Sequence, residues 1–110
     1  MANLKPRPFC CIRAVLGKIA DKKLMALGFK KIEDYKCVAA YKRYNKEYGC
    51  TQVLDLMHEL HGRAVIKSYD PDLMDSEYTG CCCIGITVKE AVAASMKIIS
   101  KGWNRRVSDG

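Results

Sequence analysis

Long hydrophobic runs are missing from this chain of 110 residues. No apolar stretch approaches the roughly 20 residues that a transmembrane helix needs. The apolar run Phe9–Ile12 is interrupted by Arg13, so it falls short of the ~7–15 apolar residues at the centre of a signal peptide. We therefore expect no membrane contact and a cytoplasmic location, where cysteines stay reduced.

Metal-binding spacings are missing as well, although the chain has seven cysteines. Structural zinc sites take their ligands from two closely spaced pairs, and no Cys-x-x-Cys pair occurs here. His58 and His61 are three residues apart, whereas a zinc metalloprotease helix needs them at positions i and i+4. We expect no metal, no cofactor and buried free thiols that behave as small hydrophobic side chains. A zinc or redox protein is the alternative.

Catalytic patterns are also absent. The chain has no glycine-rich phosphate loop, no Gly-x-Ser-x-Gly turn and no dinucleotide-binding fingerprint. None of the cysteines has a local context that would activate it as a nucleophile beside a histidine. The sequence therefore predicts a protein that is not an enzyme.

Positive charge is what the chain has in excess. Lysine and arginine total 19 against 12 acidic residues, which gives a net charge of +7. The excess lies mainly in residues 1–49, which hold 12 basic and 4 acidic side chains. Such a basic half attracts phosphates or an acidic protein.

Hydrophobic periodicity predicts one domain over residues 1–110, with an α+β fold. Apolar residues at helical spacing predict an N-terminal helix that Gly17 weakens and Gly28 ends. Thr87 and Glu90 match a capping box and predict a C-terminal helix that ends at Gly102, with Lys97 and Lys101 on its solvent side. We expect residues 1–9 to be a flexible lead-in and residues 104–110 a frayed tail.

The central part of the chain has the shorter period of strands. The predicted segments are Lys31–Tyr44, Cys50–Leu60 and Arg63–Tyr69, with a buried fourth strand at Gly80–Ile86. We predict a two-layer fold, in which an antiparallel meander of three to four strands packs against the N-terminal and the C-terminal helix.

One stretch of the predicted sheet interleaves tyrosines with basic side chains. Aromatic and cationic side chains together can stack bases and pair phosphates, but tyrosine is also enriched at protein interfaces. We predict that this stretch binds a partner and favour a protein interface over nucleic-acid contact. The candidate residues are Tyr35, Lys36, Tyr41, Lys42, Arg43, Tyr44 and Lys46.

The second half of the chain resembles small phage and prophage proteins, most of them uncharacterised. The similarity rests on the capped segment Gly85–Trp103, with its Glu, Ala, Lys-Ile and terminal Gly-Trp, and on Ile66–Tyr69 and Leu27–Phe29. It implies a mobile-element origin and a small α+β fold, and it carries no functional residue over. Some small phage proteins bind and disable host machinery, including CRISPR nucleases.

These observations lead to one functional hypothesis and one alternative. The first is a non-enzymatic phage or mobile-element protein that binds a host protein or ribonucleoprotein in the host cytoplasm, as an anti-CRISPR inhibitor of host defence does. The alternative is a basic module that binds single-stranded nucleic acid through its N-terminal half.

Overall fold

The computed structural model describes residues 8–58, 63–74 and 83–103, and for residues 8–11 and 74 the backbone alone. A long helix is followed by four strands, a short helix and a final helix. Their bounds are α1 Pro8–Ala26, β1 Lys30–Asp34, β2 Val38–Asn45, β3 Cys50–His58, β4 Ala64–Tyr69, α2 Pro71–Met74 and α3 Val88–Lys101.

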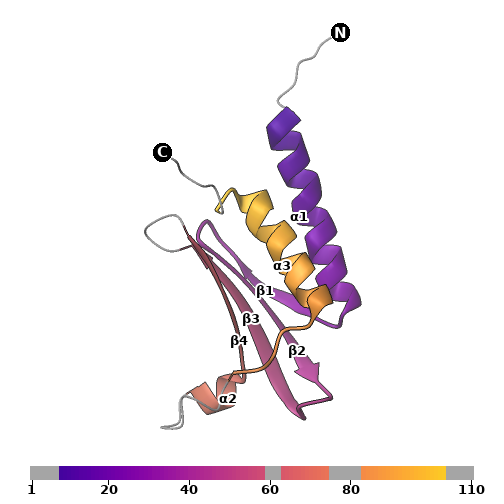
Figure 1. The fold of residues 1–110 in the computed structure, drawn as a ribbon, viewed down its shortest axis with the longest axis vertical. Coiled ribbons are helices and arrows are strands. Elements are labelled where there is room, and N and C mark those ends of the chain that lie inside the picture. The colour runs from indigo at the N-terminus through magenta and orange to yellow at the C-terminus, as the bar shows by residue number, and fades with distance from the viewer. Residues whose placement is uncertain (1–7, 59–62, 75–82, 104–110) are drawn as a thin grey trace.

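The four strands form one antiparallel sheet in the order β1-β2-β3-β4. Both long helices, α1 and α3, lie over the same face of this sheet (Figure 1). The predicted α+β fold with a helical layer and a sheet layer is thereby confirmed. The opposite face of the sheet is covered by neither α1 nor α3 (Figure 1).

The strand predicted at Lys31–Tyr44 is in fact two strands, β1 and β2, joined by a turn at residues 35–37. This turn contains no glycine, proline or asparagine, so the sequence gives no turn signal there. Contacts from distant segments hold it instead: Lys101 donates to the Tyr35 carbonyl, and the Trp103 ring nitrogen donates to the Lys36 carbonyl at 3.1 Å.

The first strand also contains a β-bulge. Lys31 pairs with Tyr41 and Glu33 pairs with Ala40, so Ile32 is an extra residue between them. As a result, Lys31 and Asp34 both reach the helix-covered face, although they are three positions apart.

The predicted fourth strand at Gly80–Ile86 differs from the structure. Residues 80–82 lie outside the described residues, and residues 83–86 contribute one isolated bridge between Cys83 and Tyr69. The sheet nevertheless has four strands, because the segment predicted as its first strand forms both β1 and β2. The cysteines also differ from expectation, because Cys37 and Cys83 are exposed and Cys50 is half-buried.

The helix ends follow the sequence closely. Thr87 and Glu90 form the predicted capping box, and Gly102 ends α3 in the left-handed conformation with φ 74°. Gly28 has φ 98° just after α1. Gly17 does not divide α1, which runs unbroken from Pro8, so residues 8 and 9 of the predicted lead-in are helical. The rest of the predicted lead-in and the predicted tail at 104–110 lie outside the described residues.

Gly17 instead allows the two helices to lie close together. A Cβ atom at this position would lie 3.2 Å from the Ser100 hydroxyl oxygen on α3. Below this helical layer the core consists of fully or almost fully buried side chains from α1, β2, β3, α3 and the residues just after the two helices. They are Leu24, Phe29, Ala39, Tyr41, Leu54, Leu56, Ala93, Ala94, Ile98 and Trp103.

Candidate binding surface

The predicted partner-binding residues of β2 are divided between the two faces of the sheet. Successive side chains of a strand point to opposite faces. Tyr41 and Arg43 point towards the helices, where Tyr41 is fully buried. Lys42 and Tyr44 are exposed on the opposite face.

The remaining predicted residues lie at the two ends of β2. Tyr35 and Lys36 are in the turn before the strand, and Lys46 is in the turn after it. Eight strand residues separate these turns, which corresponds to about 25 Å. The structure therefore does not bring the predicted residues together as one site.

Tyr41 belongs to a polar cluster between the helices and the sheet. Its hydroxyl donates to Asp21 of α1 at 2.6 Å. The Lys97 ammonium lies 3.1 Å from carboxylate oxygens of both Asp21 and Asp34, and Lys101 also pairs with Asp34. Lys97 is only 4 % exposed. The expectation that Lys97 and Lys101 face solvent was wrong, because carboxylates from α1 and β1 draw both lysines inward.

This cluster shifts the acid–base behaviour of its members. Burial raises the pKa of Asp21 and of Asp34, but hydrogen bonds from Tyr41 and the lysines outweigh burial and hold both carboxyl pKa values below the usual range. The hydrogen bond to Asp21, set against burial, raises the pKa of Lys31. Burial and the same carboxylate raise the pKa of the Tyr41 hydroxyl.

Arg43 belongs to a second buried cluster. Its guanidinium pairs with Glu90 of α3, donates to the Leu27 carbonyl at 2.7 Å and donates to the Gln52 side chain at 3.0 Å. Gln52 in turn donates to Ser68 at 2.8 Å. The cluster thus ties α3 and the end of α1 to three strands.

Together the two clusters use three of the eight carboxylates in the described ranges for ion pairs within the fold. Asp21, Asp34 and Glu90 are all used in internal ion pairs. Exposed acids with no ion pair in the described ranges remain at Glu33, Glu47 and Asp72. Exposed basic side chains with no ion pair in those ranges are far more numerous: Arg13, Lys18, Lys22, Lys23, Lys30, Lys36, Lys42, Lys46, Arg63, Lys67 and Lys89.

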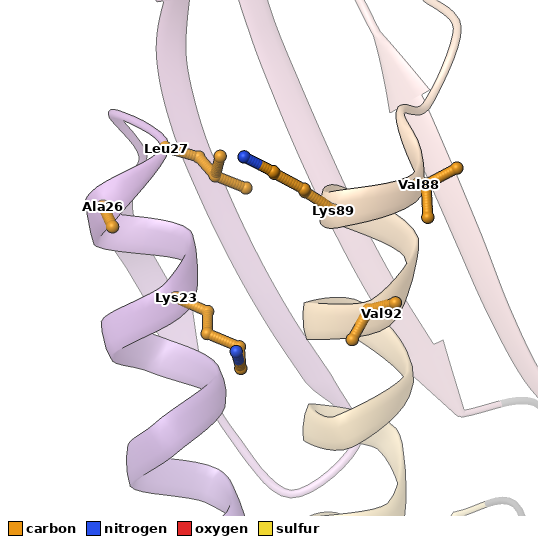
Figure 2. A pocket seen from close by; sticks show the side chains of 6 residues that line it. All are labelled: Lys23, Ala26, Leu27, Val88, Lys89 and Val92. Atoms are coloured by element: carbon orange, nitrogen blue, oxygen red, sulfur yellow. The ribbon is translucent and has the colours of Figure 1, made fainter.

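The outer side of the helical layer is where this charge meets exposed apolar side chains. A groove of about 420 Å³ lies between the end of α1 and the start of α3 (Figure 2). Lys23 extends from α1 towards α3, and Lys89 extends from α3 towards Leu27 (Figure 2). The groove is lined by Lys23, Ala26, Leu27, Val88, Lys89 and Val92.

Sequence reasoning did not single out these groove residues, although one signal pointed to them. Asp21 is the only acidic residue of α1, and Glu90 is the only acidic residue of α3. The capping box fixes Glu90 at the N-terminus of α3, where its carboxylate accepts the Thr87 backbone N–H and its own backbone N–H donates to the Thr87 hydroxyl. Both helices were therefore left with an outer surface that carries positive charge alone.

Within the described ranges, no helix combines the length and the low polarity that crossing a membrane requires. The same ranges contain no cluster of three or more histidine, cysteine or acidic side chains placed to hold a metal ion. Comparison with protein-family models, with curated proteins and with solved structures gives no match.

Proposed function

We propose that this chain is a non-enzymatic binding protein whose partner is an acidic protein. The observation that carries the proposal is the inward placement of the carboxylates of α1 and α3, which leaves a surface dominated by unpaired lysines. A surface with charge of one sign steers encounters with a partner of opposite charge.

Exposed aliphatic side chains among the lysines favour a protein over a nucleic acid. Ile12, Val15 and Ile19 of α1 are exposed beside Lys18 and Lys22. Nucleic-acid surfaces combine positive charge with aromatic stacking or polar base contacts, whereas the centres of protein interfaces are apolar. The inward placement of Tyr41 and Arg43 also leaves the nucleic-acid alternative with fewer residues.

The similarity to phage proteins suggests where to look for the partner. A bacterial host protein is the class to test, and proteins of host defence such as CRISPR nucleases come first. An inhibitor of this kind would act by occupying a surface, so no catalytic residue is required of it.

Affinity capture from a bacterial lysate tests this function. One half of the lysate is treated with nuclease, and retained proteins are identified by mass spectrometry. We expect an acidic protein in both halves, with weaker retention by the Lys18→Glu/Lys22→Glu variant. Loss of the retained material after nuclease treatment would instead support the single-strand nucleic-acid alternative. Retention that the charge reversal leaves unchanged would contradict the proposed basic surface.

A further inference from the structure

The first helix is apolar on two sides. Ala20 and Leu24 are completely buried against the rest of the fold, whereas Ile12, Val15 and Ile19 are exposed. Ile12, Val15 and Ile19 follow the i, i+3, i+7 spacing of one helical face. An exposed apolar stripe bordered by charged side chains is typical of an interaction surface, so the outer stripe of α1 is suited to a partner.

The final helix carries a matching outer stripe. Val88, Val92 and Ile99 are spaced i, i+4 and i+11 and therefore share a face. Val88 is 79 % exposed. The two helices run side by side in opposite directions (Figure 1), with Gly17 next to Ser100 and Leu27 in the same groove as Val88. The stripe of α3 enters this groove through Val88 and Val92, and the end of α1 lines it with Lys23, Ala26 and the following Leu27.

Charge around the groove has one sign. Lys23 and Lys89 line it (Figure 2), and Lys22 is exposed on the flank of α1. Asp21 and Glu90 are the only acids that the two helices possess, and both are held in internal ion pairs. An occupant that contacts the apolar floor must therefore place acidic groups against these lysines.

We propose that this groove binds an acidic amphipathic helix of the partner protein. This inference rests on the proposed function and adds the form of the recognised segment. A helix laid into a groove between two helices anchors itself through apolar side chains at i, i+3 or i+4, and i+7. Its remaining face supplies glutamates and aspartates to Lys22, Lys23 and Lys89.

Two other occupants fit the groove less well. A second copy of the chain would bring the same lysines against each other across a two-fold axis. An anionic membrane is usually entered by large side chains such as tryptophan, phenylalanine and leucine on a convex helix. Here the exposed apolar groove residues are two valines and an alanine in a concavity, and Trp103 is buried.

A fluorescent peptide of about 18 residues, long enough to form a helix on binding, provides the probe. It places leucines at i, i+3, i+4 and i+7 and glutamates elsewhere. A second peptide has the same composition with the leucines scattered around the helix. Binding to the full chain is measured by fluorescence anisotropy at about 150 mM salt, where long-range attraction is screened.

Charge-reversal variants provide a matched comparison. Lys23→Glu/Lys89→Glu changes the groove, whereas Lys42→Glu/Lys67→Glu changes the net charge equally on the other side of the sheet. We expect the amphipathic peptide to bind at least about tenfold more tightly than the scattered one. The groove variant should lose about tenfold in affinity, and the control variant less than about twofold. Circular dichroism confirms that both variants are folded.

The outcomes separate this inference from the proposed function. If both peptides bind equally and both variants weaken them equally, the groove is not the binding site. The proposal of an acidic partner, attracted by the basic surface as a whole, then still stands. No binding of either peptide, together with capture of an acidic protein from the lysate, also overturns the groove alone. Binding to phosphatidylserine vesicles that the groove variant abolishes, with no peptide binding, assigns the groove to a membrane. Failure of both the peptides and the capture overturns both proposals.

Discussion

The Arg43 guanidinium on β2 and the Glu90 carboxylate on α3 form an ion pair beneath the start of the final helix. Glu90 is 1 % exposed, and it also accepts the Thr87 backbone N–H in the capping box. One carboxylate therefore fixes both the beginning of α3 and the position of that helix over the sheet.

The two roles of Glu90 are separable by substitution. Glu90→Gln keeps a side chain that caps the helix but leaves Arg43 without its counter-charge. We expect it to lower the free energy of unfolding by about 3 kcal/mol, as for other broken buried pairs. Thr87→Ala removes one cap contact and should cost about 1 kcal/mol. Urea unfolding measures both, and a Glu90→Gln variant as stable as the original chain would show that only the cap, and not the pair with Arg43, contributes.

Acid should destabilise the fold through Asp21 and Asp34. Their pKa values are lower in the folded chain than the usual 3.8, because lysines and Tyr41 bond the charged forms. The unfolded chain then binds more protons, so stability falls as the pH decreases below about 4 towards the folded pKa values. Urea midpoints between about pH 6 and 2 should show this fall. Asp34→Asn should flatten it, and the exposed control Glu47→Gln should not.

Close approach of the helices should make Gly17 intolerant of a large side chain. Gly17→Leu must displace Ser100 and α3, which should lower the free energy of unfolding by about 1–3 kcal/mol. Ala14→Leu places the same side chain on the exposed side of α1 and serves as the control. Thermal unfolding distinguishes the two, and similar midpoints would mean that the helices separate easily.

Separating folding from binding at Tyr41 and Lys42 needs two single variants. Tyr41→Phe removes the hydroxyl that donates to Asp21 and should cost about 1 kcal/mol of stability without changing partner binding. Lys42→Ala should leave stability within about 0.5 kcal/mol, because the side chain is exposed. Unfolding and affinity capture, done on the same samples, test both. A loss of binding in Tyr41→Phe at full stability would contradict the internal placement of this tyrosine.

Thiol reactivity should differ between Cys37 and Cys50. Cys37 is exposed in the β1–β2 turn, whereas burial and the nearby Asp70 raise the pKa of Cys50. Because the thiolate is the reactive form, iodoacetamide at neutral pH should modify Cys37 first. Mass spectrometry of the peptides that contain each cysteine follows the reaction. Asp70→Asn should speed modification of Cys50 and leave Cys37 unchanged.

Local signals made the helix ends predictable. The hydroxyl of Thr87, the carboxylate of Glu90 and the backbone freedom of Gly102 act within one or two turns of chain. The β1–β2 turn was not predictable in this way, because the groups that hold it come from Lys101 and Trp103, more than sixty positions away.

The candidate site was harder to predict than the fold. Alternation along β2 separates Tyr41 and Arg43 from Lys42 and Tyr44, but it does not say which pair the helices cover. The burial of Lys97 could not be predicted either. A lysine is rarely buried without partners, and the partners of Lys97, Asp21 and Asp34, come from other elements of the fold.

The bulge in β1 determines which of its side chains face the helices. Lys31 and Asp34 reach the same cluster only because Ile32 is an extra residue in the pairing with β2. If all residues of β1 paired with β2 in strict alternation, with no bulge at Ile32, Lys31 and Asp34 would face opposite sides of the sheet and could not both reach this cluster. The outermost strand, which would otherwise be free to slide along its neighbour, is thus locked in register by an ion pair with a helix.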